Sequence, residues 1–160
     1  MSDLRELYQQ VIIEHSKSPR NCRVIENADA TAEGHNPLCG DEVTVYVKLE
    51  GDRVSDISFK GNGCAISTAS ASLLTEVLKG KTREEAEALF RSFHELVKGE
   101  LPGPGPELGK LKVFSGVSEF PVRVKCATLV WHTMRAALDR MKELVTTEHD
   151  GSPAVPASRG

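Results

Sequence analysis

Residues 42–60 carry a period of two, which constrains the fold more than any other feature of the chain. Four apolar side chains alternate with polar ones in its first half: Val43, Val45, Val47 and Leu49. Residues 50–52 (Glu-Gly-Asp) are typical of a turn, and Ile57 and Phe59 continue the alternation beyond it, although Val54 is out of phase. The pattern predicts an antiparallel hairpin with one buried face, which other elements must cover.

Helical periods on both sides of the hairpin supply that cover. After residues 61–63 (Gly-Asn-Gly), five apolar positions fit a helix that ends at Gly80: Ile66, Ala69, Leu73, Val77 and Leu78. A capping box of Thr82 and Glu85 begins the next helix, which Gly99 ends and whose apolar positions are Ala86, Leu89, Phe90, Phe93 and Val97. Helical spacing also predicts an amphipathic helix before residues 18–19 (Ser-Pro) and a core helix over about residues 121–145.

Three segments lack such periods. Residues 24–32 are weakly patterned and fit either a strand or an ordered loop. Residues 100–109 (Glu-Leu-Pro-Gly-Pro-Gly-Pro-Glu-Leu-Gly) are expected to form an irregular surface excursion, because proline removes amide donors and glycine raises the cost of ordering. The tail from residue 146 onwards has too little apolar surface to fold, so we expect it to be disordered.

Composition narrows the class of protein. A chain of 160 residues, 39% of them hydrophobic, fits one globular domain. A net charge of -3 gives no basic field that would bind nucleic acid or an anionic membrane, and no apolar run approaches the roughly 20 residues that span a bilayer. We therefore expect a soluble, cytoplasmic protein. In that compartment four cysteines are not expected to form a disulfide framework, which directs attention to metal binding or thiol chemistry.

Three of the cysteines stand at boundaries between elements. Cys39 lies in a proline- and glycine-containing turn, two residues before Asp41, so a thiolate and a carboxylate could face one ion. Cys64 opens a helix, whose unpaired amide donors and dipole favour the thiolate. Cys126 follows two cations, Arg123 and Lys125, near the start of the last helix. Each position also has a plain structural interpretation: a glycine turn, a tight strand-to-helix junction, and a buried cysteine on a helix face.

Taken together, three thiols and one carboxylate make the four-ligand shell that Zn²⁺ prefers. The ligands are separated in sequence, so they form a site only if the fold brings them together. Cys22 follows the first helix without a ligand-like neighbour, and we expect it to be inert. Of the five histidines, only His35 lies near a ligand loop, where it could support a ligand or simply be structural.

Three sequence blocks resemble the iron–sulfur cluster assembly scaffold family of IscU and the NifU N-terminal domain, and within it the SufU branch. The blocks are residues 36–41 (Asn-Pro-Leu-Cys-Gly-Asp), residues 60–72, which contain Gly-Asn-Gly-Cys, and residues 121–129 (Pro-Val-Arg-Val-Lys-Cys-Ala-Thr-Leu). The resemblance extends over most of residues 1–146. It implies an α+β fold in which a small antiparallel sheet of about three strands packs against helices and a metal site lies at one exposed tip.

The resemblance also implies residue roles. It makes Cys39, Asp41, Cys64 and Cys126 the metal or cluster ligands, places a SufU-type insertion at residues 99–120, and leaves residues 147–160 as a disordered tail. Similarity to the SufU branch implies a sulfurtransferase-like protein that holds Zn²⁺ and accepts persulfide sulfur on Cys39 from a SufS-type cysteine desulfurase. Arg123 and Lys125 could offset the negative charge of the ligands or be ordinary surface charges.

Two alternatives use the same residues. The chain could be a scaffold that assembles a [2Fe–2S] cluster and transfers it to apoproteins, or a purely structural zinc module. Lys125 argues against the first, because IscU-type members have a histidine immediately before the third cysteine. The glycine-rich setting of the ligands argues against the second.

Overall fold

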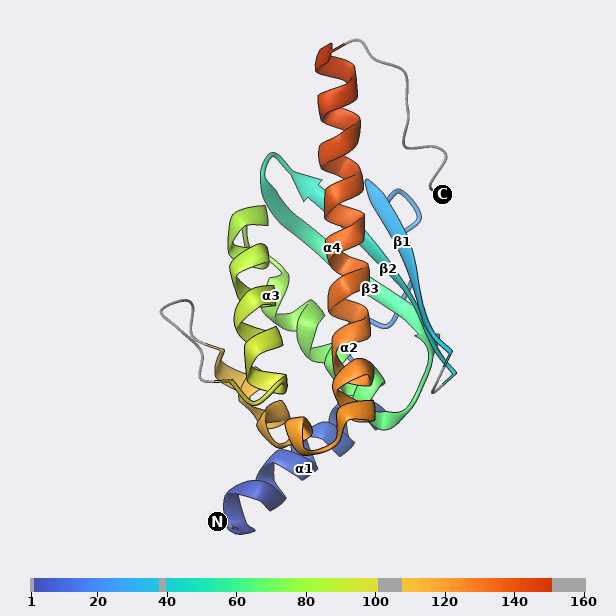
Figure 1. Cartoon of the computed structure of the whole chain (residues 1–160). Coiled ribbons are helices and arrows are strands. Elements are labelled where there is room, and N and C mark those ends of the chain that lie inside the picture. Colours follow the sequence, from blue (N-terminus) through green and yellow to red (C-terminus); the bar gives the residue numbers. More distant parts are fainter. Residues whose placement is uncertain (1, 38–39, 101–107, 151–160) are drawn as a thin grey trace.

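The computed structural model describes residues 2–37, 40–100 and 108–150, and these form a three-stranded antiparallel sheet covered by helices (Figure 1). Strands β1 (Ala30–Asn36), β2 (Asp41–Glu50) and β3 (Arg53–Asn62) lie in the order β1-β2-β3. The α+β fold class and the hairpin predicted over residues 42–60 are confirmed. Of the undecided residues 24–32, only the last three belong to a strand, which continues to Asn36.

A bulge in the hairpin accounts for the phase of Val54. Lys48 pairs with Asp56, whereas Leu49 pairs with Val54, so Ser55 is an extra residue on β3. The insertion returns Val54 to the face that carries Ile57, and both side chains are fully buried. The Ser55 hydroxyl donates a hydrogen bond of 3.1 Å to the carbonyl oxygen of Lys48. The break in the apolar alternation at Val54 is therefore explained by the β-bulge at Ser55.

The helices occupy the positions that their periods predict. They are α1 (Ser2–Lys17), α2 (Ala65–Leu78), α3 (Arg83–Val97) and α4 (Pro121–Asp150). The capping box of α3 is present, with Glu85 N donating to Thr82 Oγ1 at 3.1 Å and Thr82 N donating to Glu85 Oε1 at 2.9 Å. Helix α4 crosses the sheet and contacts β1 and β2, with α2 and α3 beside it (Figure 1). It continues to Asp150, five residues past the predicted end, and residues 151–160 of the predicted tail lie outside the described residues.

A 3₁₀ helix, η1 (Gly109–Glu119), adds core residues that the periods did not predict. Leu111, Phe114 and Val117 recur every three residues, the period of a 3₁₀ helix, and all three are buried. The Phe114 ring contacts Phe93 edge to face at 5.6 Å, and Phe93 stacks on Trp131 at 4.6 Å. Residues 101–107 of the expected surface excursion lie outside the described residues, whereas η1 forms part of the core.

None of the helices within the described residues combines the length and apolar character that crossing a membrane requires.

Candidate metal centre

Asp41 is placed by the connection between β1 and β2. It is the first residue of β2 and pairs with Asn36, the last residue of β1. Gly40 has a φ of 73°, a left-handed conformation that glycine adopts readily, and its N–H donates to the Asn36 carbonyl oxygen at 2.8 Å. The tight connection directs the Asp41 side chain inward, where it is fully buried.

Cys64 caps the N-terminus of α2 beside Asp41. Its sulfur accepts a hydrogen bond from Ser67 N at 3.4 Å, and its own N–H donates to Asp41 Oδ1 at 3.0 Å. Gly63 permits this contact, because a Cβ atom there would lie 2.9 Å from Asp41 Oδ1. The strand-to-helix junction thus joins the carboxylate and the thiol in one hydrogen-bonded unit.

Cys126 reaches the same place from α4. Its side chain is fully buried, and the ligand atoms of Asp41, Cys64 and Cys126 all lie within 4.8 Å of one another. Figure 1 shows the first turns of α4 and the connection from β3 to α2 at the same end of the molecule. The fold therefore brings together three of the four residues predicted as ligands. Cys39, the fourth, lies outside the described residues.

The chemistry of this donor set fits a zinc ion. Tetrahedral Zn²⁺ with bonds of about 2.3 Å to sulfur separates neighbouring ligand atoms by about 3.8 Å, so a cluster within 4.8 Å needs only a small contraction to bind it. Two thiols and a carboxylate provide three of the four positions. The partly exposed member is Cys64, which gives the centre a side open to solvent, whereas Asp41 and Cys126 are enclosed.

The remaining candidates are not members of this cluster. His35 is exposed, and its Nε2 lies 3.9 Å from Glu42 Oε2. Because neighbouring residues of a strand face opposite sides, the side chains of Glu42 and Asp41 point in opposite directions, so His35 does not support Asp41. Cys22 is exposed, forms an isolated β-bridge with Phe59 of β3, and is not a member of the cluster of Asp41, Cys64 and Cys126. Arg123 and Lys125 are exposed on the first turns of α4.

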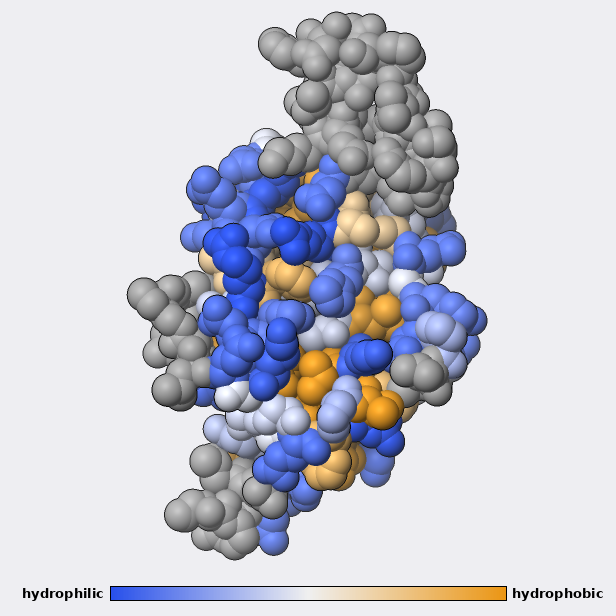
Figure 2. Space-filling model, in the orientation of Figure 1, coloured by the Kyte–Doolittle hydropathy of each residue, from blue (hydrophilic) through white to orange (hydrophobic). Residues whose placement is uncertain are grey.

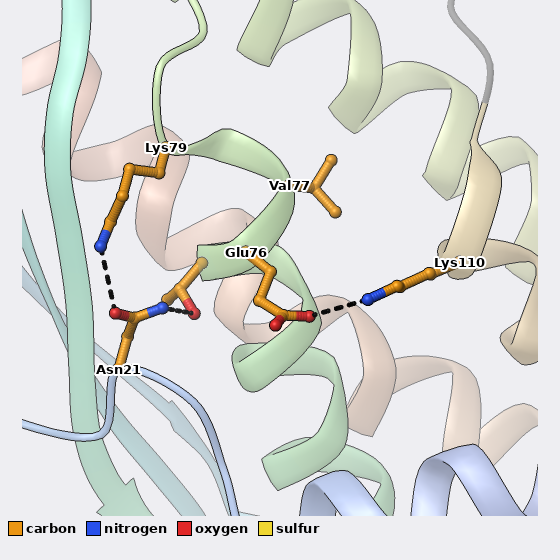
Figure 3. A pocket seen from close by; sticks show the side chains of 6 residues that line it. Asn21, Glu76, Val77, Lys79 and Lys110 are labelled. Carbon is orange, nitrogen blue, oxygen red and sulfur yellow. Dashed lines mark hydrogen bonds and ion pairs between the residues drawn. The ribbon is translucent and has the colours of Figure 1, made fainter.

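A shallow pocket of about 410 Å³ lies elsewhere on the described surface, at the C-terminal end of α2 (Figure 3). Lys79 donates to Asn21 Oδ1 at 3.3 Å, Asn21 Nδ2 donates to Thr75 Oγ1 at 3.1 Å, and Lys110 pairs with Glu76 at 3.6 Å. These groups satisfy one another, and none belongs to the cysteine cluster. These contacts fasten the segments around Asn21 and Lys110 to the C-terminal end of α2, and the pocket is separate from the candidate centre.

Two large apolar side chains are exposed just before Cys126 in the sequence. Phe120 is 60% exposed and Val122 is 52% exposed. Val122 precedes Cys126 by four residues, which places both on one face of α4. On the face drawn in Figure 2, apolar surface forms separate areas along the middle and lower part of the molecule, among hydrophilic residues. Such exposed apolar side chains are suited to contact with another protein.

Comparison with known proteins decides the family. A family model described as the NifU-like N-terminal domain matches residues 7–143. The chain belongs to this family. The match spans the sheet, the three described ligand candidates and most of α4, so family membership and the observed fold agree.

Members of the NifU-like family with related sequences carry two kinds of name. The iron–sulfur cluster assembly scaffold protein IscU of Streptococcus pyogenes serotype M1 is 41% identical over 88% of this chain and 87% of its own length. The zinc-dependent sulfurtransferase SufU of Bacillus subtilis (strain 168) is 42% identical over 83% of this chain and 90% of its own length.

A solved member of the family agrees in fold. The crystal structure of FiSufU from Fervidobacterium islandicum AW-1, described as an iron–sulfur cluster assembly scaffold protein for the SUF system, superposes with a TM-score of 0.76 at 39% identity. The superposition covers 81% of this chain and 94% of the solved chain. The SufU-type resemblance drawn from the three sequence blocks is confirmed at the level of the family.

Proposed function

We propose that this protein serves iron–sulfur cluster assembly as a zinc-bearing sulfur acceptor, which takes persulfide sulfur from a SufS-type cysteine desulfurase. The observation that carries the proposal is the convergence of Asp41, Cys64 and Cys126 within 4.8 Å. The name of the Bacillus subtilis relative, a zinc-dependent sulfurtransferase, supports it. The cytoplasm is the expected location, because the proposed ligands need thiols kept reduced.

The proposed ligands are Cys39, Asp41, Cys64 and Cys126. Zinc, when bound, would hold the thiols deprotonated without changing its own oxidation state. Asp41 is anchored for this role by the N–H of Cys64, and the Cys64 sulfur by the N–H of Ser67. Both donors leave further lone pairs on the ligand atoms available, so anchoring and metal binding are compatible.

Cys39 is the proposed sulfur acceptor. Its thiolate attacks the terminal sulfur of the desulfurase persulfide, a new S–S bond forms on Cys39, and the partner's cysteine leaves as a thiolate. The exchange conserves electrons, so no oxidant or reductant is required. The assignment to Cys39 rests on the sequence, in which it adjoins Gly40, a residue whose left-handed backbone marks a tight turn.

Transfer of this kind needs a transient contact with the desulfurase. Phe120, immediately before α4, and Val122, in its first turn, offer exposed apolar side chains. The cations Arg123 and Lys125 follow them on the helix that carries Cys126. An apolar contact with a charged margin suits a specific but reversible interface. This surface is therefore the proposed docking region for the desulfurase.

A second candidate function is a scaffold that assembles a [2Fe–2S] cluster and passes it to apoproteins. The observation that favours it is the 41% identity to the Streptococcus pyogenes protein, which is named a scaffold. The same residues would then serve as cluster ligands. Lys125, where IscU-type chains have histidine, removes one nitrogen donor and favours the zinc proposal.

Metal analysis and a desulfurase assay test the proposal. Protein purified in air should be colourless and contain about one zinc per chain, and it should stimulate sulfide release by a SufS-type desulfurase. Cys39→Ala should abolish the stimulation, whereas Cys22→Ala, which removes an exposed cysteine outside the cluster, should retain it. A brown protein with stoichiometric iron and sulfide would support the scaffold instead. Full stimulation by Cys39→Ala would overturn the assignment of the accepting thiol.

A further inference from the structure

A buried hydroxyl joins α2, whose N-cap is Cys64, to α4, which carries Cys126. Ser70 lies on α2 with no exposed surface, and its Oγ donates a hydrogen bond of 2.6 Å to the Ala127 carbonyl oxygen on α4. Ser70 Oγ also accepts a hydrogen bond of 3.2 Å from Nε1 of Trp131. One hydroxyl thus connects α2 to two points of α4, and it uses both its donor and an acceptor position.

The position of this hydroxyl relates it directly to the metal centre. Ala127 is the residue after Cys126, and Ser70 follows Cys64 by six residues, about 9 Å along the helix axis. Helices are stiff over such distances. The contact between Ser70 and Ala127 is therefore placed to constrain how closely the N-terminal end of α2 approaches the first turns of α4, and with it the separation of the two sulfur atoms.

The bond is strongly constrained because its surroundings are dry. Ser70, Ala127 and Trp131 are all buried, so no water replaces a lost partner. If the hydroxyl is removed, the indole N–H of Trp131 loses this bond inside the core. The helices must then shift to satisfy that donor or leave it unpaired, and either outcome alters the packing beside Cys126.

We propose that Ser70 is a positioning residue for the metal centre: its hydroxyl holds α2 against α4 at the separation that lets Cys64 and Cys126 bind one ion. The inference rests on the proposed function, because it assumes that these cysteines bind metal. It adds a residue that makes no contact with the ion and acts through the two helices.

The same helix offers a matched control. Ser72 is also fully buried, but its Oγ contacts His15 Nδ1 at 2.7 Å and accepts from Arg20 N at 2.8 Å, so it binds the α1 side of the molecule. Serine-to-alanine changes at 70 and 72 remove the same group from the same helix at similar burial. A general loss of stability would affect both variants, whereas a change in ligand geometry should follow Ser70 alone.

Metal affinity and a cobalt spectrum test the inference. The full chain and its Ser70→Ala and Ser72→Ala variants are loaded with Zn²⁺ in competition with a chromogenic chelator, and with Co²⁺ to record the thiolate charge-transfer and ligand-field bands. Ser70→Ala should weaken Zn²⁺ binding by about 10- to 100-fold, the usual effect of removing a group that orients ligands. It should also shift the cobalt bands. Ser72→Ala should change neither.

Trp131 provides a second readout, because it is the sole tryptophan of the chain and bonds to Ser70. Zn²⁺ addition should change its fluorescence in the unmodified protein, and the change should shrink in Ser70→Ala. If that variant does not fold by circular dichroism, Ser70→Cys, which is close in size but a weaker hydrogen-bond donor, replaces it with the same expectations.

The possible outcomes separate this inference from the proposed function. Unchanged affinity, cobalt bands and fluorescence response in the folded Ser70 variant would overturn the positioning role and leave the metal centre intact. Equal losses in the Ser70 and Ser72 variants would also overturn it, because stability alone would explain them. An unmodified chain that binds neither Zn²⁺ nor Co²⁺ would overturn both proposals.

Discussion

The carboxylate of Asp41 accepts the backbone N–H of Cys64 at 3.0 Å, although the two residues stand 23 positions apart. The bond joins the start of β2 to the N-cap of α2, so the hairpin and the helix hold the carboxylate and the thiol as a pair. The Asp41 side chain therefore has two tasks: it accepts the N–H of Cys64, the N-cap residue of α2, and it faces the proposed ion. Substitutions can separate these tasks.

Asp41→Asn should keep the hydrogen bond from Cys64 and weaken the metal site. The amide oxygen can still accept the Cys64 N–H, so the free energy of unfolding of the metal-free protein should fall little. Asp41→Ala should lose about 1–3 kcal/mol, because it leaves the Cys64 N–H without this acceptor. Both changes remove a charged ligand and should lower Zn²⁺ affinity at least about 10-fold. Chelator competition and urea unfolding measure the two effects. Glu42→Gln, at the exposed neighbouring position, is the control and should change neither quantity.

Gly34→Ala should destabilise the contact between β1 and α4. A Cβ atom at residue 34 would collide with Thr133 Oγ1 and lie 3.2 Å from Leu129 Cδ1. Overpacking of this kind costs about 1–3 kcal/mol, measured by urea unfolding. Gly116→Ala meets no atom within 4 Å and should be tolerated. Adding Thr133→Ala to the Gly34 variant should recover part of the loss, and a Gly34→Ala protein as stable as the parent would contradict the packing described.

Acid should weaken the attachment of α1 through His15. Burial lowers the pKa of His15, and the nearby Arg20 lowers it further. The unfolded chain therefore binds this proton at higher pH than the folded chain, so stability is retained above about pH 6.5 and falls as the pH drops below it. Four charged groups act on this histidine: Arg20, Lys110, Glu14 and Glu76.

Unfolding free energies measured between pH 7.5 and pH 5 check this expectation. Burial also lowers the pKa of His132, so this residue adds to the loss of stability at low pH. The contribution of His15 is therefore measured by comparing the unmodified protein with substituted variants. His15→Gln should reduce the slope with pH and leave the contribution of His132 in place. A slope that does not respond to His15→Gln would contradict the assignment.

Removal of the metal should lower the melting temperature. A ligand that binds only the folded chain stabilises it by about 2.7 kcal/mol at a concentration 100-fold above its dissociation constant. Scans of zinc-loaded and chelator-treated protein should therefore differ by several degrees. The difference should vanish in Cys64→Ser and persist in Cys22→Ala. If all three proteins respond alike, zinc binds somewhere other than the proposed centre.

Local periods predicted most of the fold because most elements here have one apolar face. The alternation at residues 42–60 and the helical spacing of α3 and α4 reflect burial on one side, whereas α2 is buried all round over residues 69–75. β1 lacked this signal, since Gly34 and His35 interrupt its apolar positions. The helix η1 was not predicted, because its period of three fits neither a strand nor an α-helix. The proline-rich residues before it also suggested irregular structure.

The candidate site was predictable in its residue types but not in its geometry. Cysteine and aspartate at element boundaries suggested ligands, and the structure brings Asp41, Cys64 and Cys126 together, while the role of Cys39 stays a prediction. Ser70 was not singled out. A signal existed in the run of small hydroxyl residues along α2, where apolar side chains would be expected, because buried hydroxyls need partners from neighbouring elements.

The packing of η1 also limits how this chain can be shortened. Because Phe114 lies against Phe93, excising residues 109–119 would open a hole beside the aromatic stack and expose a phenylalanine to water. A trimmed version would need a smaller or polar side chain at position 93 before it could fold well. Loop grafts and deletions in this protein should therefore leave η1 intact, because it forms part of the core.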